Sequence, residues 1–279
     1  MKYKTYKVYD PNTTRETNPN DRINAAFDDT SKMIEYVNEK RPEIMDKFVQ
    51  AIETRLDGEL DGYRIKEGKF DFKKYKDQYP FIERYPELFE LTLGFVCKNL
   101  GLSADHSFND EKVTVLAVKS IGSVSVPRYH RIAAMADVLG REKGIQLYKD
   151  FVEYRTSLPF EEKNTKSVAE LREEAIRNWS EAEAFDFALH VYDEHRHVFK
   201  FVNCISYDTL KHLDDPEFGY LAQCYPTTFI VEQMYEKLGQ RRQVTLFNHP
   251  FCDELYWDRT VDPDPEPPSF ELLEKMKIE

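Results

Sequence analysis

The chain has 279 residues, with 51 acidic against 39 basic side chains, a formal net charge of -12 and a sequence pI near 5.2. Hydrophobic residues make up 41% of the chain, which is enough for a core and excludes wholesale disorder. The scattered Lys and Arg argue against a nucleic-acid partner, because phosphate contacts need clustered cations.

The sequence also limits where the protein works. It contains no run of roughly 18 apolar residues, so we expect no membrane-spanning helix and no membrane partner. The first residues lack the apolar stretch of a secretory signal peptide, so we expect a cytoplasmic protein. Its four cysteines are then expected to be free thiols rather than a disulfide framework.

Residues 1–25 are polar, and we expect an irregular arm with one short strand at its start. From there to residue 180 the apolar positions recur at three- and four-residue steps, which is typical of amphipathic helices. We expect helices over residues 25–56, 72–100, 111–125, 129–154 and 167–179, with breaks at Pro42, Pro80 and Pro86. The last of them opens with a capping box formed by Ser167 and Glu170.

After Trp179 the apolar period changes to two, which is typical of strands. Residues 185–192 and 198–204 are predicted to form a β-hairpin. We expect helices at 207–213 and about 218–238, and closing strands at 243–247 and 252–257.

These elements predict an α+β fold. A helical part at residues 26–180 precedes a ββααββ part at 181–260, and residues 261–279 form a tail rich in Pro and acid. The economical packing places the helical part on a small four-stranded antiparallel sheet with helices on one face. No Gly/Ser linker separates the parts, so we expect them to share an interface.

The signatures of phosphate loops, dinucleotide folds, serine hydrolases and zinc proteases are absent. The chain has 10 Gly, which leaves little material for a glycine-rich cofactor loop. We therefore predict no cofactor and no metal ligands, although a divalent metal is left open.

Three cysteines of the α+β part lie at predicted element ends: Cys204, Cys224 and Cys252. Strand ends and a helix start can converge at one edge of a small sheet. A helix N-terminus favours a thiolate and lowers the thiol pKa, so Cys224 is the best candidate nucleophile. His249 or Asp253 would be its base or orienting partner.

Two other interpretations of these cysteines stay open. Free cysteines are often buried and act as small hydrophobes. The three thiols and His249 also make up four zinc-type ligands, although their spacing lacks a Cys-x-x-Cys pair. A non-catalytic thiol or metal module is therefore the alternative to an enzyme.

A further candidate group is Arg128, His130 and Arg131, which we expect at the start of the longest helix. Two arginines beside a helix N-terminus can hold a substrate carboxylate. A solvated helix start with an internal ion pair is the commoner explanation of such a group.

Residues 185–256 resemble the L-2-amino-thiazoline-4-carboxylic acid hydrolase family. The pieces that carry the resemblance are residues 199–204 (FKFVNC), 224–227 (CYPT), 242–246 (RQVTL) and 252–256 (CDELY). With the upstream helix at 132–154 it covers about 130 residues of the chain. Two positions depart from the family pattern: Thr227 stands where we expect an acid, and Ile205 where Pro often follows the first Cys.

The resemblance implies an enzyme that hydrolyses a five-membered C=N heterocycle, a cyclic thiourea-like carboxylate, to an S-carbamoyl amino acid. We expect Cys224 to add to the ring carbon, Asp253 and His249 to transfer protons, and Cys204 and Cys252 to lie beside them.

The carboxylate of this small-molecule substrate would pair with Arg128 or Arg131. An enzyme that opens or isomerises a related heterocycle in a biosynthetic pathway is an alternative. The sequence indicates neither the substrate nor the oligomeric state.

Overall fold

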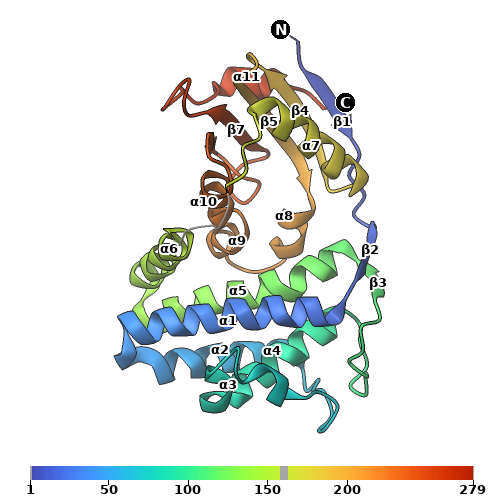
Figure 1. Cartoon of the computed structure of the whole chain (residues 1–279), viewed down its shortest axis with the longest axis vertical. Helices are drawn as coiled ribbons and strands as arrows, with labels where there is room; N and C mark the ends of the chain where they lie inside the picture. The colour runs from blue at the N-terminus through green and yellow to red at the C-terminus, as the bar shows by residue number, and fades with distance from the viewer. Residues whose placement is uncertain (1, 158–162, 279) are drawn as a thin grey trace. The chain divides into compact units, whose positions relative to one another are not determined.

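The computed structural model describes residues 2–157 and 163–278, which fall into two compact units (Figure 1). One unit, residues 14–151, is mainly helical; the other joins residues 1–13 to residues 152–279 and contains the main sheet. The first thirteen residues thus belong with the C-terminal half of the chain. Among the described residues, every helix is too short or too polar to cross a bilayer.

Four long helices form the core of the helical unit: α1 (Pro19–Lys40), α2 (Met45–Leu60), α4 (Pro86–Asn99) and α5 (Ala117–Leu139). α1 begins where the Asn18 side chain accepts a hydrogen bond from the backbone N–H of Asn20. Its buried face carries Phe27, which packs edge-on against Phe89 of α4. The helices are thus held by the periodic apolar positions that predicted them.

Shorter elements connect these helices: β2 (Thr14–Thr17), η1 (Pro42–Ile44), η2 (Phe72–Tyr75), α3 (Phe81–Arg84) and β3 (Val113–Leu116). β2 and β3 pair antiparallel. The helix expected over residues 111–125 is therefore wrong in its first part, which is β3. The breaks at Pro42, Pro80 and Pro86 are confirmed.

The helix expected over residues 129–154 is two helices, α5 and α6 (Arg141–Ser157). They divide at Gly140, whose φ of +83° lies in the left-handed region that glycine adopts without strain. α5 also begins at Ala117, so Pro127 lies inside it. The segment Arg128–Arg131 is therefore in the interior of a helix, and the expectation that it starts one is wrong.

The main sheet is antiparallel, with strand order β1-β4-β5-β7-β6. Its strands are β1 (Lys4–Lys7), β4 (Phe185–Val191), β5 (Arg196–Cys204), β6 (Leu238–Arg241) and β7 (Cys252–Asp258). The α+β class and the β4–β5 hairpin are confirmed. The sheet has five strands rather than four, because β1 pairs with β4 at its edge (Figure 1).

The strand predicted at residues 243–247 is wrong. β7 pairs with β5 on one side and with β6 on the other, and residues 243–247 follow β6 without a ladder of their own. The backbone N–H groups of Gln243 and Val244 donate to the Asp253 side chain instead. A local side-chain acceptor thus competes with strand pairing at this point.

One face of the sheet carries Phe187, Phe199, Phe201, Cys252 and Tyr256, and we call it the thiol face. It is covered by α7 (Val168–Glu181), which begins at the predicted capping box. Trp179 of α7 contacts Phe199 and Phe201 with ring centroids 4.9 and 5.3 Å apart. These aromatic contacts fix the helix against the sheet.

The opposite face, which we call the tail face, carries Ala188, Val198, Leu255 and Trp257. It is covered by α11 (Phe270–Lys275). Helices therefore cover both faces, and the expectation of one covered face is wrong. Three further helices follow β5: α8 (Ile205–Leu210), α9 (Pro216–Gln223) and α10 (Tyr225–Met234).

Candidate functional site

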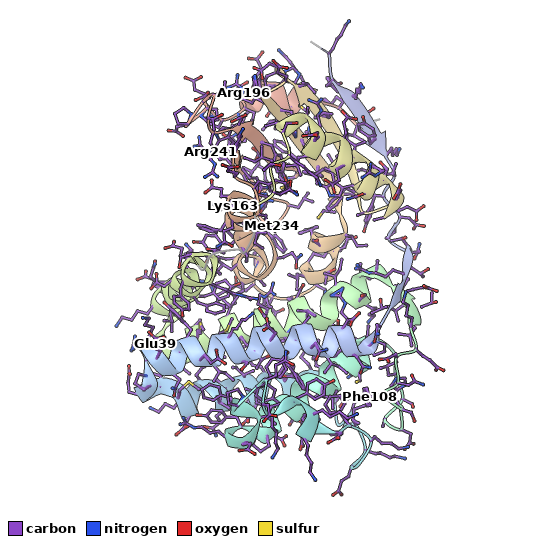
Figure 2. The ribbon with its side chains drawn as sticks, viewed as in Figure 1. Glu39, Phe108, Lys163, Arg196, Met234 and Arg241 are labelled. Carbon is purple, nitrogen blue, oxygen red and sulfur yellow. The ribbon has the colours of Figure 1, made fainter. Side chains whose placement is uncertain are left out.

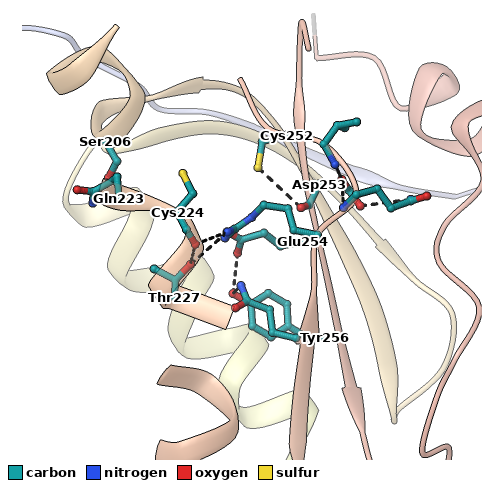
Figure 3. Close-up of polar contacts among 12 residues, drawn as sticks. Ser206, Gln223, Cys224, Thr227, Cys252, Asp253, Glu254 and Tyr256 are labelled. Atoms are coloured by element: carbon teal, nitrogen blue, oxygen red, sulfur yellow. Dashed lines mark hydrogen bonds and ion pairs between the residues drawn. The ribbon is translucent and has the colours of Figure 1, made fainter. Parts of the chain in front are cut away.

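Strand β7 presents alternate side chains to the two faces of the sheet. Cys252, Glu254 and Tyr256 lie on the thiol face, whereas Asp253 and Leu255 lie on the tail face (Figure 3). The functional candidates at Cys252 and Asp253, adjacent in sequence, are thus separated by the sheet.

A β-bulge brings Cys204 to the same face. Phe187 pairs with Phe201 but Asp186 pairs with Asn203, so β5 has one extra residue at this point. After the bulge, Cys204 lies opposite Phe185, on the thiol face. Without the extra residue its side chain would have pointed to the other face.

Cys224 connects α9 to α10, where the chain turns between two helices. Its N–H donates to the Tyr220 carbonyl at 2.8 Å, which closes α9. The three thiols lie close enough for each to affect the titration of another: Cys224 raises the pKa of Cys204, and both raise the pKa of Cys252. The three thiols are therefore within electrostatic reach of one another.

The expectation of a lowered thiol pKa is wrong. Burial raises the pKa of Cys224 to about 11 and that of Cys204 to about 12, and it raises the pKa of Cys252 well above its ordinary value. Cys224 lies at the N-terminus of α10 but also at the C-terminus of α9, so the two helix ends oppose each other. Desolvation then decides the direction, and all three groups are neutral thiols at pH 7.

A buried ion pair lies beside Cys224. Arg242 pairs with Glu254, and their side chains are only 8% and 14% exposed. Arg242 also donates from Nη1 to the Cys224 carbonyl at 2.9 Å and to Thr227 Oγ1 at 3.2 Å (Figure 3). A pair this deeply buried offsets its desolvation only through such added hydrogen bonds.

The Glu254 carboxylate is held from its other side by an aromatic residue. Tyr256 donates its hydroxyl proton to Glu254 at 2.6 Å and accepts from Gln240 Nε2 at 2.9 Å. The charge of Glu254 raises the pKa of both Cys224 and Cys252, although burial is the larger cause. An acceptor carboxylate, a cation and three thiols therefore share one site.

His197 completes the thiol face behind Tyr256. Its ring stacks on Tyr256 with centroids 5.4 Å apart and is fully buried. Neither ring nitrogen has a hydrogen-bond partner among the described residues. Burial, with a smaller effect of Arg172, lowers its pKa to about 3, so the imidazole is neutral.

The side chains of Asp253 and His249 lie with the tail face rather than with the thiols. The Asp253 carboxylate accepts from the backbone N–H groups of Gln243 and Val244 at 3.0 and 2.9 Å. Burial raises its pKa, against these hydrogen bonds. The His249 ring packs 4.2 Å from that of Phe251, a member of the tail-face cluster.

The zinc-type set of three thiols and His249 is consequently not assembled. Within residues 2–157 and 163–278, no group of three or more His, Cys, Asp or Glu side chains is arranged to hold a metal ion.

The carboxylate-binding group expected at Arg128, His130 and Arg131 lies in the core of the helical unit. Both arginines pair with Asp29, Arg128 through Nε at 2.9 Å, and Arg131 is fully buried. Burial, followed by the charges of Arg55 and Arg131, lowers the pKa of His130 to about 4. The two arginines therefore have an internal carboxylate in the place where the sequence suggested a substrate.

Sequence reasoning missed Glu254, Arg242 and Tyr256. Glu254 and Tyr256 follow Cys252 at strand spacing, so the period of two could have placed them with that thiol. Nothing in the sequence indicated the pairing of Arg242 with Glu254, because it depends on the turn between β6 and β7.

Comparison with known proteins finds no matching family model, curated protein or solved structure.

Proposed function

We propose that the protein is a hydrolase that opens a small C=N heterocycle, similar to a 2-amino-thiazoline carboxylate, by cysteine-assisted addition of water. The observation that carries this proposal is the convergence of three thiols beside the Arg242–Glu254 pair. The resemblance to the amino-thiazoline hydrolases supplies the substrate class.

Cys224 is the nucleophile in this proposal. It is half-buried whereas Cys252 is buried, and burial raises its pKa less than that of the other two thiols. The positive charge of Arg242 also favours its thiolate, since it acts to lower the pKa. A thiol with a pKa of about 11 needs a base to become reactive at pH 7.

Glu254 is that base. As the Cys224 sulfur bonds to the ring carbon of the C=N group, its proton passes to the Glu254 carboxylate and then to the ring nitrogen. The bond between that carbon and the ring nitrogen then breaks as a proton of the exocyclic amino group passes to the departing nitrogen, which opens the ring to an amine and leaves a C=NH group on the carbon bound to Cys224. Water adds to this carbon while Glu254 passes one of its protons to the imine nitrogen. The carbon–sulfur bond to Cys224 then breaks as the hydroxyl proton passes to the sulfur, which regenerates the thiol and leaves a carbamoyl product.

Arg242 and Thr227 have positioning roles. Arg242 keeps Glu254 beside the thiols and fixes the Cys224 carbonyl. The resemblance leads us to expect an acid at position 227. In this chain position 227 is Thr, and the carboxylate that pairs with Arg242 is that of Glu254. The site therefore keeps a carboxylate without an acid at position 227.

The test is to replace Cys204, Cys224 and Cys252 singly by Ser and to follow ring opening of 2-amino-thiazoline-4-carboxylate by chromatography. Cys97→Ser is the matched control, because Cys97 is buried in α4 of the helical unit. We expect Cys224→Ser to lower kcat/KM by about 1000-fold or more, and Cys97→Ser to leave it unchanged. Wild-type activity in all three single variants would end the thiol mechanism.

A further inference from the structure

The helical unit carries a groove that the proposed reaction does not use. A pocket of about 690 Å³ is bordered by η2 and α4, and a second of about 370 Å³ shares Phe72, Lys76 and Glu90 with it. The two pockets adjoin at these shared residues, and we call them together the groove. Its larger part is within the size range of small-molecule sites.

The groove has an unusual charge for this chain. Residues 64–76 contain six Lys or Arg and two acids, in a protein with a net charge of -12. Four of these cations line the larger pocket: Arg64, Lys66, Lys73 and Lys76. Such a local excess of cations in an acidic protein attracts an anion to this one place.

Aromatic rings form the apolar walls. Phe70 and Phe72 line the larger pocket, and their centroids are 4.9 Å apart. Phe70 is fixed by stacking on Tyr75 at 5.1 Å and by an edge contact with Phe108 at 4.9 Å (Figure 2 labels Phe108). Because their neighbours hold these rings, the walls are largely formed before a ligand binds.

The cations can turn towards a ligand at little cost. Lys66 and Lys76 make ion pairs with Asp105 and Glu83, but all four side chains are at least 41% exposed, and exposed pairs contribute little. The Lys73 ammonium has no hydrogen bond or ion pair to another described residue. The backbone of Lys66 is fixed by its N–H, which donates to the Ala104 carbonyl at 3.0 Å.

The acidic residues of the groove limit how much negative charge a ligand can carry. Glu67, Asp71 and Glu90 also line the larger pocket. Burial and the charge of Glu87 raise the pKa of Glu90, and Asp71 accepts from the Lys73 backbone N–H at 3.1 Å. A ligand with one anionic group and an apolar body fits this mixture better than a polyanion.

We propose that this groove binds a small aromatic anion, with its ring against Phe70 and Phe72 and its carboxylate, sulfonate or phosphate near Lys73 and Lys76. This site lies wholly within the helical unit and does not depend on the proposed hydrolase.

The experiment titrates the full-length protein with 1-anilinonaphthalene-8-sulfonate and follows its fluorescence. We expect saturable binding that weakens about fivefold or more in Lys73→Glu/Lys76→Glu and also in Phe72→Ala. Lys73→Gln/Lys76→Gln should give an intermediate loss. Lys47→Glu, an exposed change on α2 outside the groove, should bind as the wild type does. Circular dichroism of each variant before the titration verifies that it is folded.

Two results would overturn the proposal. Wild-type affinity in the folded Lys73→Glu/Lys76→Glu variant would show that the probe binds elsewhere. Displacement of the probe by hexaglutamate at lower concentrations than by benzoate or phenyl phosphate would point to an acidic peptide instead.

Discussion

Asp253 and Glu254 are neighbours on β7, but they lie on opposite faces of the sheet and have different partners. Asp253 is fully buried and accepts backbone hydrogen bonds from the turn that follows β6. Glu254 is paired with Arg242, accepts from Tyr256 and raises the pKa of all three thiols. Because side chains alternate between the two faces of a sheet, residues two apart in a strand lie on the same face, whereas adjacent residues do not.

The largest expected effect is a loss of activity on substitution of Glu254 that substitution of Asp253 does not cause. Glu254→Gln keeps the size of the side chain but removes the proton acceptor, so we expect kcat/KM for ring opening to fall about 100-fold. Asp253→Asn should leave the activity per folded molecule within about twofold, because the sheet separates it from the thiols. Steady-state kinetics on both variants test the assignment, and equal losses would contradict it.

The second effect is a loss of folding stability on substitution of Asp253. Asp253→Ala leaves the backbone N–H groups of Gln243 and Val244 without their acceptor in a buried place. We expect the free energy of unfolding to fall by about 1–3 kcal/mol, measured by urea denaturation. Glu266→Ala, an exposed acid of the tail, is the control and should change little. An unchanged stability in Asp253→Ala would show that the turn does not need this carboxylate.

The third prediction concerns pH and the thiol face. His197 has a pKa of about 3 in the folded protein against 6.5 as a model group, so the unfolded chain binds the extra proton first. Its contribution to stability is therefore complete above about pH 6.5 and is lost as the pH falls towards 3. His197→Phe should weaken the loss of stability between pH 7 and pH 4, measured by thermal unfolding.

His195→Phe, which removes a half-exposed ring beside the same strand, is the control for the loss of a histidine. If His197→Phe and the wild type lose equal stability over that pH range, the buried neutral imidazole does not contribute to the acid sensitivity.

The smallest effect concerns the tail face. Buried Lys200 donates from Nζ to the carbonyls of Leu273 and Met276 at 2.8 and 3.0 Å, at the C-terminal end of α11. Lys200→Met keeps the length of the side chain but removes both donors, so we expect faster hydrogen exchange in α11 with ring opening unchanged. Unchanged exchange in α11 would show that this lysine does not hold the helix.

Much of this fold was predictable from the sequence because it depends on local periodicity. The alternation in residues 185–204 gave the β4–β5 hairpin, and Ser167 with Glu170 marked the start of α7. The misplaced strand at 243–247 has a different cause. Its backbone donors are taken by Asp253, a contact between residues about ten positions apart that no local period reveals.

The sequence predicted which cysteines belong to the candidate site, but it did not predict their protonation state or the charged residues beside them. Cys204, Cys224 and Cys252 were recognisable from their places at element ends. The thiol pKa values depend on burial, and the partner of Arg242 depends on tertiary packing. The bulge in β5, which sets the side of the sheet on which Cys204 lies, is equally invisible in the apolar pattern.

The most direct test of the thiol site is mass spectrometry of the protein mixed with 2-amino-thiazoline-4-carboxylate and quenched in acid within one turnover. We predict a covalent adduct of the ring-opened substrate on the peptide that contains Cys224, absent in Cys224→Ser and slower to form in Glu254→Gln, which lacks the base that activates the thiol. Turnover of the substrate by Cys224→Ser at the wild-type rate, with no adduct on any thiol, would contradict the account.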